Sequence, residues 1–539
     1  MASVNPTQRR YFEHPKPLSR SIVWELQRRF YDSHGAKAWQ DSHVPFEISS
    51  NAYLARRYAE ILLGFMRDLR SGRMGNRWRT TPLTIVELGA GAGRLGFLVT
   101  RELKRLIEAL GWAPNSFRYV LTDFTPSNLH TYETNPRVIE LADEGVLDMA
   151  LFDAEHPAAF KLRRSGERLG PGGRPRPVAL IANYLFDTVH HDAFKVEDGA
   201  LYETRVGLAL KPRHKTMPKR RDPDALDHLE LTEHHRKIEL PYYRDPALDG
   251  VLAEYRAAFD ECEMLFPIGA FNCMAWFRKV ARAPMLVICG DKGYRSDAEL
   301  KAGVGAFLSL HAKGSFSTMV NLNAIGRVVT RRGGLALHAP LHDLTFTVSA
   351  FLTGAKPAAA IETRFAYDAA LAGVGPRHYQ TTLDELKRRW SDPSVPSALA
   401  MIRLADFDQD VFMRFAHVLQ RKGQRQQSDT RADLIAALEA VWQRFYPLSA
   451  KEPVVFTIGQ IQFALRRFAE ARRFFERALV LEEDDAKTRY NIALCSQALG
   501  AFDRALVEFD AAIARDGAYA PARLAREKLS RHLATRTRR

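Results

Sequence analysis

The sequence predicts an α/β domain with a doubly wound sheet, followed by an all-α domain of helical repeats. Three observations predict this fold class. An apolar run near residue 84 ends in a glycine-rich turn and leads into an amphipathic segment, which is the pattern of a strand, a loop and a helix. Acidic residues then close successive apolar runs at nearly constant spacing. From about residue 450 the chain repeats itself with a period of 34 residues.

The glycine-rich turn lies in the stretch TIVELGAGAGRLGF, residues 84–97. An acid stands where the strand should end, and glycines follow at alternate positions, so the backbone can turn sharply and approach a ligand without Cβ atoms in the way. This combination predicts a nucleotide-type cofactor site. The residues expected to hold the cofactor here are Glu87, Gly89, Gly91 and Gly93.

Two kinds of cofactor use such a turn. A dinucleotide site needs G-x-G-x-x-G beneath a pyrophosphate, and Gly91, Gly93 and Gly96 satisfy that spacing. S-adenosylmethionine (SAM) has no phosphate and carries an ammonium and a sulfonium group, which favour a nearby carboxylate. The pattern E-x-G-x-G-x-G that begins at Glu87 therefore favours SAM, and a methyltransferase over a nicotinamide-linked oxidoreductase.

Acidic residues end four apolar runs of this region. After Glu87 come Asp123 in FRYVLTD, Asp153 in LDMALFD and Asp187 in VALIANYLFD, at intervals of 36, 30 and 34 residues. A strand–helix–strand unit takes about 30 residues or more, and parallel strands deliver their last residues to one edge of the sheet. We expect Asp123 to accept the ribose hydroxyls and Asp153 to lie near the adenine. Helix capping is the alternative role for such acids.

Composition limits the class of protein. The 539 residues are too many for one ordinary domain, and 46% hydrophobic content is enough for buried cores. The four cysteines lack C-x-x-C spacing, so reduced, buried thiols are expected rather than disulfides. No run of about 18 apolar residues occurs, and the N-terminal region lacks the apolar core of a signal peptide. We expect a cytoplasmic protein without a membrane partner.

Charge and histidines add two further hypotheses. The net charge is +15, with basic residues crowded into 211–221 and 531–539, so nucleic acid is an alternative partner to protein. A solvated loop and a frayed chain end also explain these two runs. His190 and His191 suggest a general base near the substrate, but no third ligand is spaced to complete a site, so no metal is expected.

The predicted elements divide the chain into four parts. Residues 1–83 are expected to be helical, with an amphipathic helix over Tyr53–Leu69, and to cover the cofactor site. Residues 84–355 should form the sheet domain, with a loop at 163–177, a hairpin turning at Asp198-Gly199, an insertion at 211–245, a strand at 284–289 and more strands within 334–349. A helical connection over 356–450 should lead to repeats over 451–534.

The C-terminal repeat has the spacing of tetratricopeptide helices. Five positions recur 34 residues apart: Gly459 with Ala493, Phe468 with Phe502, Ala471 with Ala505, Phe475 with Phe509, and Ala478 with Ala512. Small residues let the two helices of a repeat approach closely, and aromatic residues fill the space between neighbours. Two repeats cannot bury their own faces, so adjoining helices should cap them. We expect this module to bind a protein partner or the protein substrate.

The segment Ile181–Leu208 resembles the MidA family of SAM-dependent methyltransferases, relatives of the mitochondrial respiratory complex I assembly methyltransferase. That family carries Asn-Glu-x-x-Asp-Ala-x-Pro-x-His before a hairpin, which Asn183, Asp187 and Phe194 match. VPFEISSN, ELGAGAG and GDKGY extend the likeness over residues 44–354, and the repeats lie outside it. The resemblance implies a class I, Rossmann-like methyltransferase that modifies a protein, with arginine as one acceptor.

The sequence departs from that family at two positions, because Tyr184 stands in place of a glutamate and Asp192 in place of a histidine. Asn183 and Asp187 are expected to face the acceptor as catalytic residues, with Tyr184 shaping its pocket. A carboxylate best aligns a guanidinium, so the missing glutamate leaves the acceptor open. The alternatives are a scaffold protein with a degenerate methyltransferase domain, and a methyltransferase of nucleic-acid bases, since residues 183–186 are similar to an Asn-Pro-Pro-Phe loop.

Overall fold

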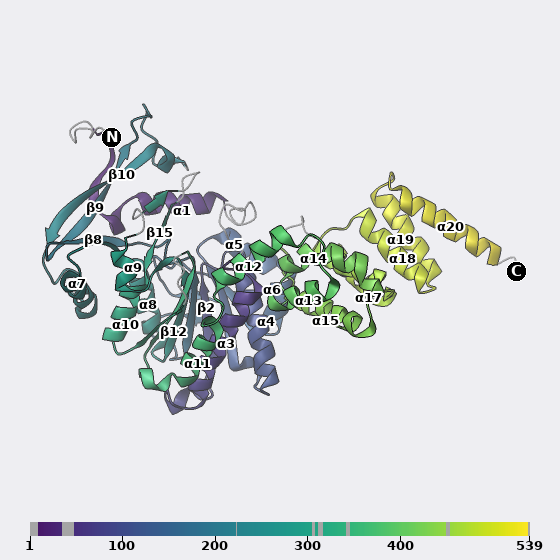
Figure 1. Ribbon diagram of the computed structural model, residues 1–539, viewed down its shortest axis with the longest axis horizontal. Coiled ribbons are helices and arrows are strands. Elements are labelled where there is room, and N and C mark those ends of the chain that lie inside the picture. The colour runs from purple at the N-terminus through teal and green to yellow at the C-terminus, as the bar shows by residue number, and fades with distance from the viewer. Residues whose placement is uncertain are drawn as a thin grey trace. The chain divides into compact units, whose positions relative to one another are not determined.

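The computed structural model describes residues 9–34, 48–222, 224–303, 308–310, 316–340, 345–448 and 453–536 (Figure 1). Val44–Glu47, the first half of VPFEISSN, lie outside the described residues. The chain forms two units, the first from residues 1–50 and 54–380 and the second from residues 51–53 and 381–539. The glycine-rich turn belongs to the first unit, and the 34-residue repeat belongs to the second.

Seven strands form the central sheet of the first unit, in the order β17-β18-β12-β7-β2-β3-β4. Their bounds are Leu83–Leu88 (β2), Phe117–Asp123 (β3), Leu147–Leu151 (β4), Val178–Asn183 (β7), Met285–Asp291 (β12), Leu335–His338 (β17) and Thr347–Thr353 (β18). The five strands from β4 to β12 run parallel, whereas β18 is antiparallel to both of its neighbours. The strands predicted at 284–289 and within 334–349 are confirmed.

Helices cover both faces of this sheet, which is why its parallel strands are almost continuously buried. On one face the sheet shares an apolar core with α7 (Pro246–Ala258), α8 (Ile268–Ala281) and α10 (Leu322–Arg331). On the other face lie α3 (Ala52–Arg70) and α4 (Arg94–Ala109), and α11 (Ile361–Leu371) packs against Gly64 of α3. Helix α3 confirms the amphipathic helix predicted at 53–69.

Shorter elements complete the first unit. Helix α1 (Val23–His34) precedes the sheet, and α5 (Pro126–Thr134) and α6 (Pro136–Asp143) connect β3 to β4. Three two-stranded pairs lie outside the two main sheets: β5 (Phe160–Lys161) with β6 (Arg168–Leu169), β13 (Gly293–Tyr294) with β16 (Val320–Asn321), and β14 (Leu308–Leu310) with β15 (Phe316–Thr318). Helix α9 (Asp297–Lys301) follows β13. Helix α12 (Pro376–Arg389) follows α11, and from residue 381 onward it belongs to the second unit.

A second sheet contains five antiparallel strands, in which β9 is paired with β1, β8 and β10, and β8 is also paired with β11. The bounds are Tyr11–Pro17 (β1), Asp192–Glu197 (β8), Ala200–Leu210 (β9), Leu229–Ile238 (β10) and Glu261–Phe266 (β11). Figure 1 shows β8, β9 and β10 as adjacent arrows. Asp198 and Gly199 both have positive φ angles between β8 and β9, which confirms the predicted hairpin.

One expectation for these regions is wrong. Residues 1–83 are not helical throughout, because Tyr11–Pro17 forms β1, whose backbone hydrogen bonds come from the distant β9 rather than from a local pattern. The segment 211–245, predicted as an insertion, contributes β10 to the second sheet and no strand to the central sheet. Five consecutive exposed residues in β10 remove the alternation of polar and apolar side chains that marks a strand in a sequence.

The second unit is built from helices. Their bounds are Val395–Leu404 (α13), Gln409–Lys422 (α14), Ser428–Arg444 (α15), Val454–Ala464 (α16), Phe468–Leu481 (α17), Ala486–Ala498 (α18), Phe502–Arg515 (α19) and Ala520–Arg536 (α20). From α16 to α20 each helix contacts the next. A Cβ at Gly459 would lie 2.7 Å from the ring of Phe475, so this glycine lets α16 and α17 approach closely.

The four cysteines are buried and unpaired, as the sequence predicts. Among the described residues, no helix combines the length and the apolar character that crossing a bilayer requires.

Candidate functional site

The glycine-rich loop joins β2 to α4 at the carboxyl edge of the central sheet. Gly89, Gly91 and Gly93 have φ angles of 63°, 55° and 80°, in the left-handed region that residues with a Cβ rarely adopt. Strand order reverses beside β2, because β3 lies on one side of it and β7 on the other. Ligands of open α/β sheets bind at such a switch point, outside the carboxyl ends of the strands.

Glu87, at the end of β2, points its carboxyl group into the protein. The hydroxyl of Tyr119 donates a hydrogen bond to its Oε2 at 3.0 Å, and a Cβ at Gly96 would lie 2.4 Å from the same oxygen. Gly96 is therefore required by packing, whichever cofactor binds. Burial raises the pKa of Glu87 to about 8, so the group is mostly neutral at pH 7. Its contact with a ligand ammonium stays a prediction.

Asp123, at the end of β3, fixes the shape of the loop. Its Oδ2 accepts a hydrogen bond from the Gly91 amide at 3.2 Å, and its Oδ1 accepts two from Thr125 at 2.9 Å. Tyr132 of α5 donates to the Gly91 carbonyl at 2.8 Å. The side chain of Asp123 is buried, and burial raises its pKa. Its predicted hydrogen bonds to a ribose remain untested by this arrangement.

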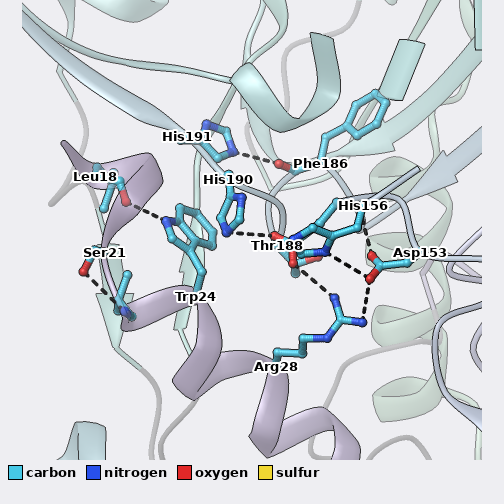
Figure 2. Close-up of polar contacts among 12 residues, drawn as sticks. Leu18, Ser21, Trp24, Arg28, Asp153, His156, Phe186, Thr188, His190 and His191 are labelled. Carbon is cyan, nitrogen blue, oxygen red and sulfur yellow. Dashed lines mark hydrogen bonds and ion pairs between the residues drawn. The ribbon is translucent and has the colours of Figure 1, made fainter. Parts of the chain in front are cut away.

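Asp153, after β4, is paired with Arg28 of α1. The two side chains approach to 2.7 Å between Nη2 and Oδ2, and His156 Nδ1 lies 3.2 Å from the same carboxylate oxygen (Figure 2). Burial opposes ionisation of Asp153, but the hydrogen bond and charge of Arg28 outweigh it and hold its pKa below the ordinary value. Asp153 is therefore a carboxylate whose partner lies far away in the sequence.

A pocket opens to solvent at this edge of the sheet, and the space between its walls, open solvent included, is about 500 Å³. Its lining residues come from α1 and from the ends of β2, β3, β4 and β7: Trp24, Gln27, Arg28, Gly89, Phe124, Phe152, Asp153, Ala154, Glu155, Leu185, Thr188 and Val189. The structure thus brings Gly89 and Asp153 to one cavity. Glu87, Gly91, Gly93 and Asp123 are not among its lining residues, and their contacts shape the loop.

The residues predicted to face the acceptor begin at the end of β7. The Asn183 side chain accepts a hydrogen bond from Tyr58 of α3 at 2.6 Å and donates one to the Ser49 carbonyl at 3.2 Å. Tyr184 has a φ of 44°, and its hydroxyl donates to the Thr345 carbonyl at 3.2 Å. A non-glycine residue held in this region marks a constrained position of the kind found at functional sites.

Asp187 lies in a buried polar group beneath the same segment. The Lys292 ammonium is 3.7 Å from its Oδ2, and its backbone amide donates to Asp291 Oδ2 at 3.2 Å. Among the described residues, its Oδ1 has no hydrogen-bond partner. Burial raises the pKa of Asp187, while the charge of Lys292 opposes the rise. The carboxyl does not line the pocket described above.

The two neighbouring histidines differ in their surroundings. Burial lowers the pKa of both to about 4, so each is neutral at pH 7. His191 Nε2 is 2.7 Å from the Phe186 carbonyl and 3.3 Å from the Thr318 hydroxyl. His190 Nε2 lies 3.5 Å from Glu155 Oε1.

Asp153, Glu155 and His156 form a group whose possible metal-ligand atoms come within 4.8 Å of one another. The guanidinium of Arg28 already lies against both carboxylates of this group.

Among the pocket residues that sequence analysis missed are Trp24, Arg28 and Phe124. The aromatic residue that directly follows Asp123 offered a local signal, since a strand-end acid and the next side chain both reach the carboxyl edge. Arg28 offered none, because it lies 125 residues before Asp153, on a helix without a motif.

Comparison with known proteins leaves the family open. No family model and no curated protein matches the chain. Two solved structures from Burkholderia thailandensis show a distant similarity, each at 14% identity over 65% of this chain and 90% of theirs. One is an uncharacterised protein of the COG1565 superfamily, with a TM-score of 0.37. The other, with a TM-score of 0.38, is a superfamily member inferred to be a methyltransferase and crystallised with S-adenosyl-homocysteine.

Proposed function

We propose that the chain is a SAM-dependent methyltransferase that modifies a protein side chain. The observation that carries the proposal is the pocket that reaches from Gly89 to Phe124 and Asp153 along the carboxyl edge of the sheet. An extended ligand in this pocket meets a glycine turn at one end, and aromatic and acidic side chains at the other. A molecule with an amino-acid end and an adenosine end has the matching chemistry.

The sheet favours SAM over a dinucleotide. A dinucleotide-binding sheet continues with parallel strands in the order 3-2-1-4-5-6. Here the strand beside β12 is the antiparallel β18. This departure, together with the acid at the end of β2, supports the methyltransferase over the oxidoreductase.

In the proposed reaction the bound cofactor supplies a methyl group on a sulfonium. The protein would orient the acceptor in line with that methyl group and exclude water, and such positioning lowers the barrier to transfer. The loop from Gly89 to Gly93 holds the methionine end, Asp123 the ribose and Asp153 the adenine amino group. Asn183 and Asp187 position the acceptor from the end of β7.

Calorimetric titration tests the cofactor. The full chain should bind S-adenosyl-homocysteine with micromolar affinity and should not bind NAD. If the chain binds NAD and not S-adenosyl-homocysteine, it is an oxidoreductase rather than a methyltransferase. A change in the absorbance of the nicotinamide on addition of substrate would identify that activity.

A scaffold protein that binds SAM without transferring its methyl group is the second candidate. The contacts of the acceptor-side residues favour it, because the Asn183 amide is engaged with Tyr58 and Ser49, and the Asp187 carboxylate with Lys292. Incubation with methyl-labelled SAM and a cell extract separates the candidates. Label in a protein band supports the methyltransferase, label in RNA supports the nucleic-acid alternative, and SAM binding without label supports the scaffold.

We also propose that helices α16 to α20 form tetratricopeptide repeats that hold a protein partner or the substrate, in a cytoplasmic protein. The close approach of α16 and α17 at Gly459 supports the repeat, as does the equivalent packing of α18, where Ala493 shares a buried cluster with Phe509. The same labelling experiment identifies the protein that the repeats hold, if that protein is the one that becomes methylated.

A further inference from the structure

The guanidinium of Arg28 lies inside the pocket, at the end opposite the glycine loop. Its Cζ is 4.3 Å from the centre of the Phe124 ring, and its two terminal nitrogens lie 2.7 Å from Asp153 and 3.4 Å from Glu155. Figure 2 shows the side chain reaching from α1 toward Asp153. One cation therefore covers the aromatic face and lies against both acids at this end.

An adenine cannot share this position with Arg28. A planar base between the guanidinium and the Phe124 ring needs two van der Waals separations, about 7 Å in all. The 4.3 Å in the structure leaves room for contact but not for a base. The carboxylate of Asp153 is likewise occupied by a donor of its own.

The helix that carries Arg28 is fixed by other residues. Trp24 Nε1 donates to the Leu18 carbonyl at 2.8 Å, and Gln27 Nε2 donates to the Phe316 carbonyl at 2.6 Å. The Trp24 ring packs against His190 and His191, with centroid separations of 5.4 and 5.9 Å. The Arg28 side chain has four rotatable bonds and is 30% exposed. It can therefore leave the pocket while α1 stays in place.

We propose that Arg28 is a gate that occupies the adenine end of the cofactor pocket and must withdraw before the adenosyl group enters. This inference rests on the proposed function, because it assigns the pocket to an adenosyl ligand. When Arg28 withdraws, Asp153 and Glu155 lose their cation, and the incoming ligand must offer a hydrogen-bond donor in return. The amino group of adenine is such a donor. The gate thus favours an adenosyl ligand over an analogue with a carbonyl at that position.

Replacement of Arg28 tests the gate through ligand affinity. The full-length Arg28→Ala protein should bind S-adenosyl-homocysteine about tenfold more tightly than wild type, since a partly buried ion pair and a cation–π contact no longer compete. Arg28→Lys keeps a charge near Asp153 and should fall between the two. Arg29→Ala is the matched control, because Arg29 lies on the same helix but bonds to Glu25 and the Arg220 carbonyl, outside the pocket.

A second ligand separates a gate from a residue that holds the cofactor. 5′-Methylthioadenosine lacks the amino-acid end, and the gate predicts that Arg28→Ala strengthens its binding by the same factor. Weaker binding of S-adenosyl-homocysteine to Arg28→Ala would mean that Arg28 holds the ligand, and would overturn the gate. Equal affinity in wild type and both Arg28 variants would also overturn it, with the proposed function intact. If no form of the protein binds either ligand, the proposed function fails, and the gate with it.

Discussion

At the scale of single residues, the buried carboxyl group of Glu87 helps to hold the glycine-rich loop in place. Its hydrogen bond from Tyr119 and the space left by Gly96 tie the end of β2 to α4 and β3. An ionised carboxyl at this depth is costly, and burial raises its pKa from 4.5 to about 8. The stabilising form is therefore the neutral one.

This shift predicts a pH dependence of stability that Glu87→Gln removes. A folded-state pKa above the unfolded one gives stability that is complete below pH 4.5 and is lost as the pH rises through 8. Between pH 6 and pH 8.5 the wild-type protein should thus lose more stability than Glu87→Gln, by up to a few kcal/mol. Thermal unfolding of both proteins at the two pH values measures the difference. Parallel curves would show that Glu87 titrates normally.

Gly91 gives the sharpest test of the loop. Valine at this φ of 55° strains the backbone, at a cost of about 1 to 3 kcal/mol. We expect Gly91→Val to weaken binding of S-adenosyl-homocysteine at least tenfold. The control is Gly111→Ala, which has a similar φ of 67° and no atom within 4 Å of the added Cβ. If calorimetry shows that both variants bind S-adenosyl-homocysteine with the affinity of the wild-type protein, the loop is not part of the cofactor site.

Local patterns in the sequence predicted which residues form the site. They did not predict the contacts that these residues make with one another and with distant residues. The glycines follow from the bend that β2 and α4 require, and Asp123 and Asp153 from the length of a strand–helix–strand unit. The partner of Asp153 could not be predicted, because Arg28 reaches it through the folding of α1 onto the sheet. Likewise, the sequence does not show that the Glu87 carboxyl accepts a hydrogen bond from Tyr119, or that the Asp123 carboxyl accepts one from the Gly91 amide.

At the scale of elements, strands with two buried faces were predictable and strands with exposed faces were not. VALIAN and MLVICGD are nearly all buried in β7 and β12, so apolar runs mark them. Strand β10 has five exposed polar residues in succession, and β1 has one buried residue, Glu13. Their pairing with β9 decides their structure, and pairing between distant segments leaves no periodicity in the sequence.

The contact between α16 and α17 yields a prediction at this scale. A leucine at Gly459 would drive its side chain into the Phe475 ring, which already lies 2.7 Å from the position of a Cβ. Overpacking of this kind costs about 1 to 3 kcal/mol. Hydrogen exchange should therefore be faster in α16 and α17 of Gly459→Leu. Gly500→Ala, where the added Cβ meets no atom within 4 Å, should leave the exchange of these helices unchanged. Unchanged exchange in Gly459→Leu would show that the two helices do not depend on this contact.

At the scale of the whole molecule, the chain separates a pocket in one unit from a helical array in the other. This division predicts that the two activities can be uncoupled. A chain that ends at residue 448 should bind S-adenosyl-homocysteine as the full chain does, because every residue of the pocket lies between Trp24 and Val189. The same shortened chain should lose methyl labelling of its protein substrate if α16 to α20 recruit it. Undiminished methyl labelling by the shortened chain would show that helices α16 to α20 do not recruit the substrate.

The central claim is that the pocket beside the glycine loop binds the adenosyl cofactor. A crystal structure of the full chain grown with S-adenosyl-homocysteine tests it most directly. We predict the homocysteine end at Gly89, the adenine on the Phe124 ring with its amino group on Asp153, and Arg28 withdrawn from that ring. A ligand bound elsewhere, or an empty pocket at saturating ligand with Arg28 still on Phe124, would contradict the account.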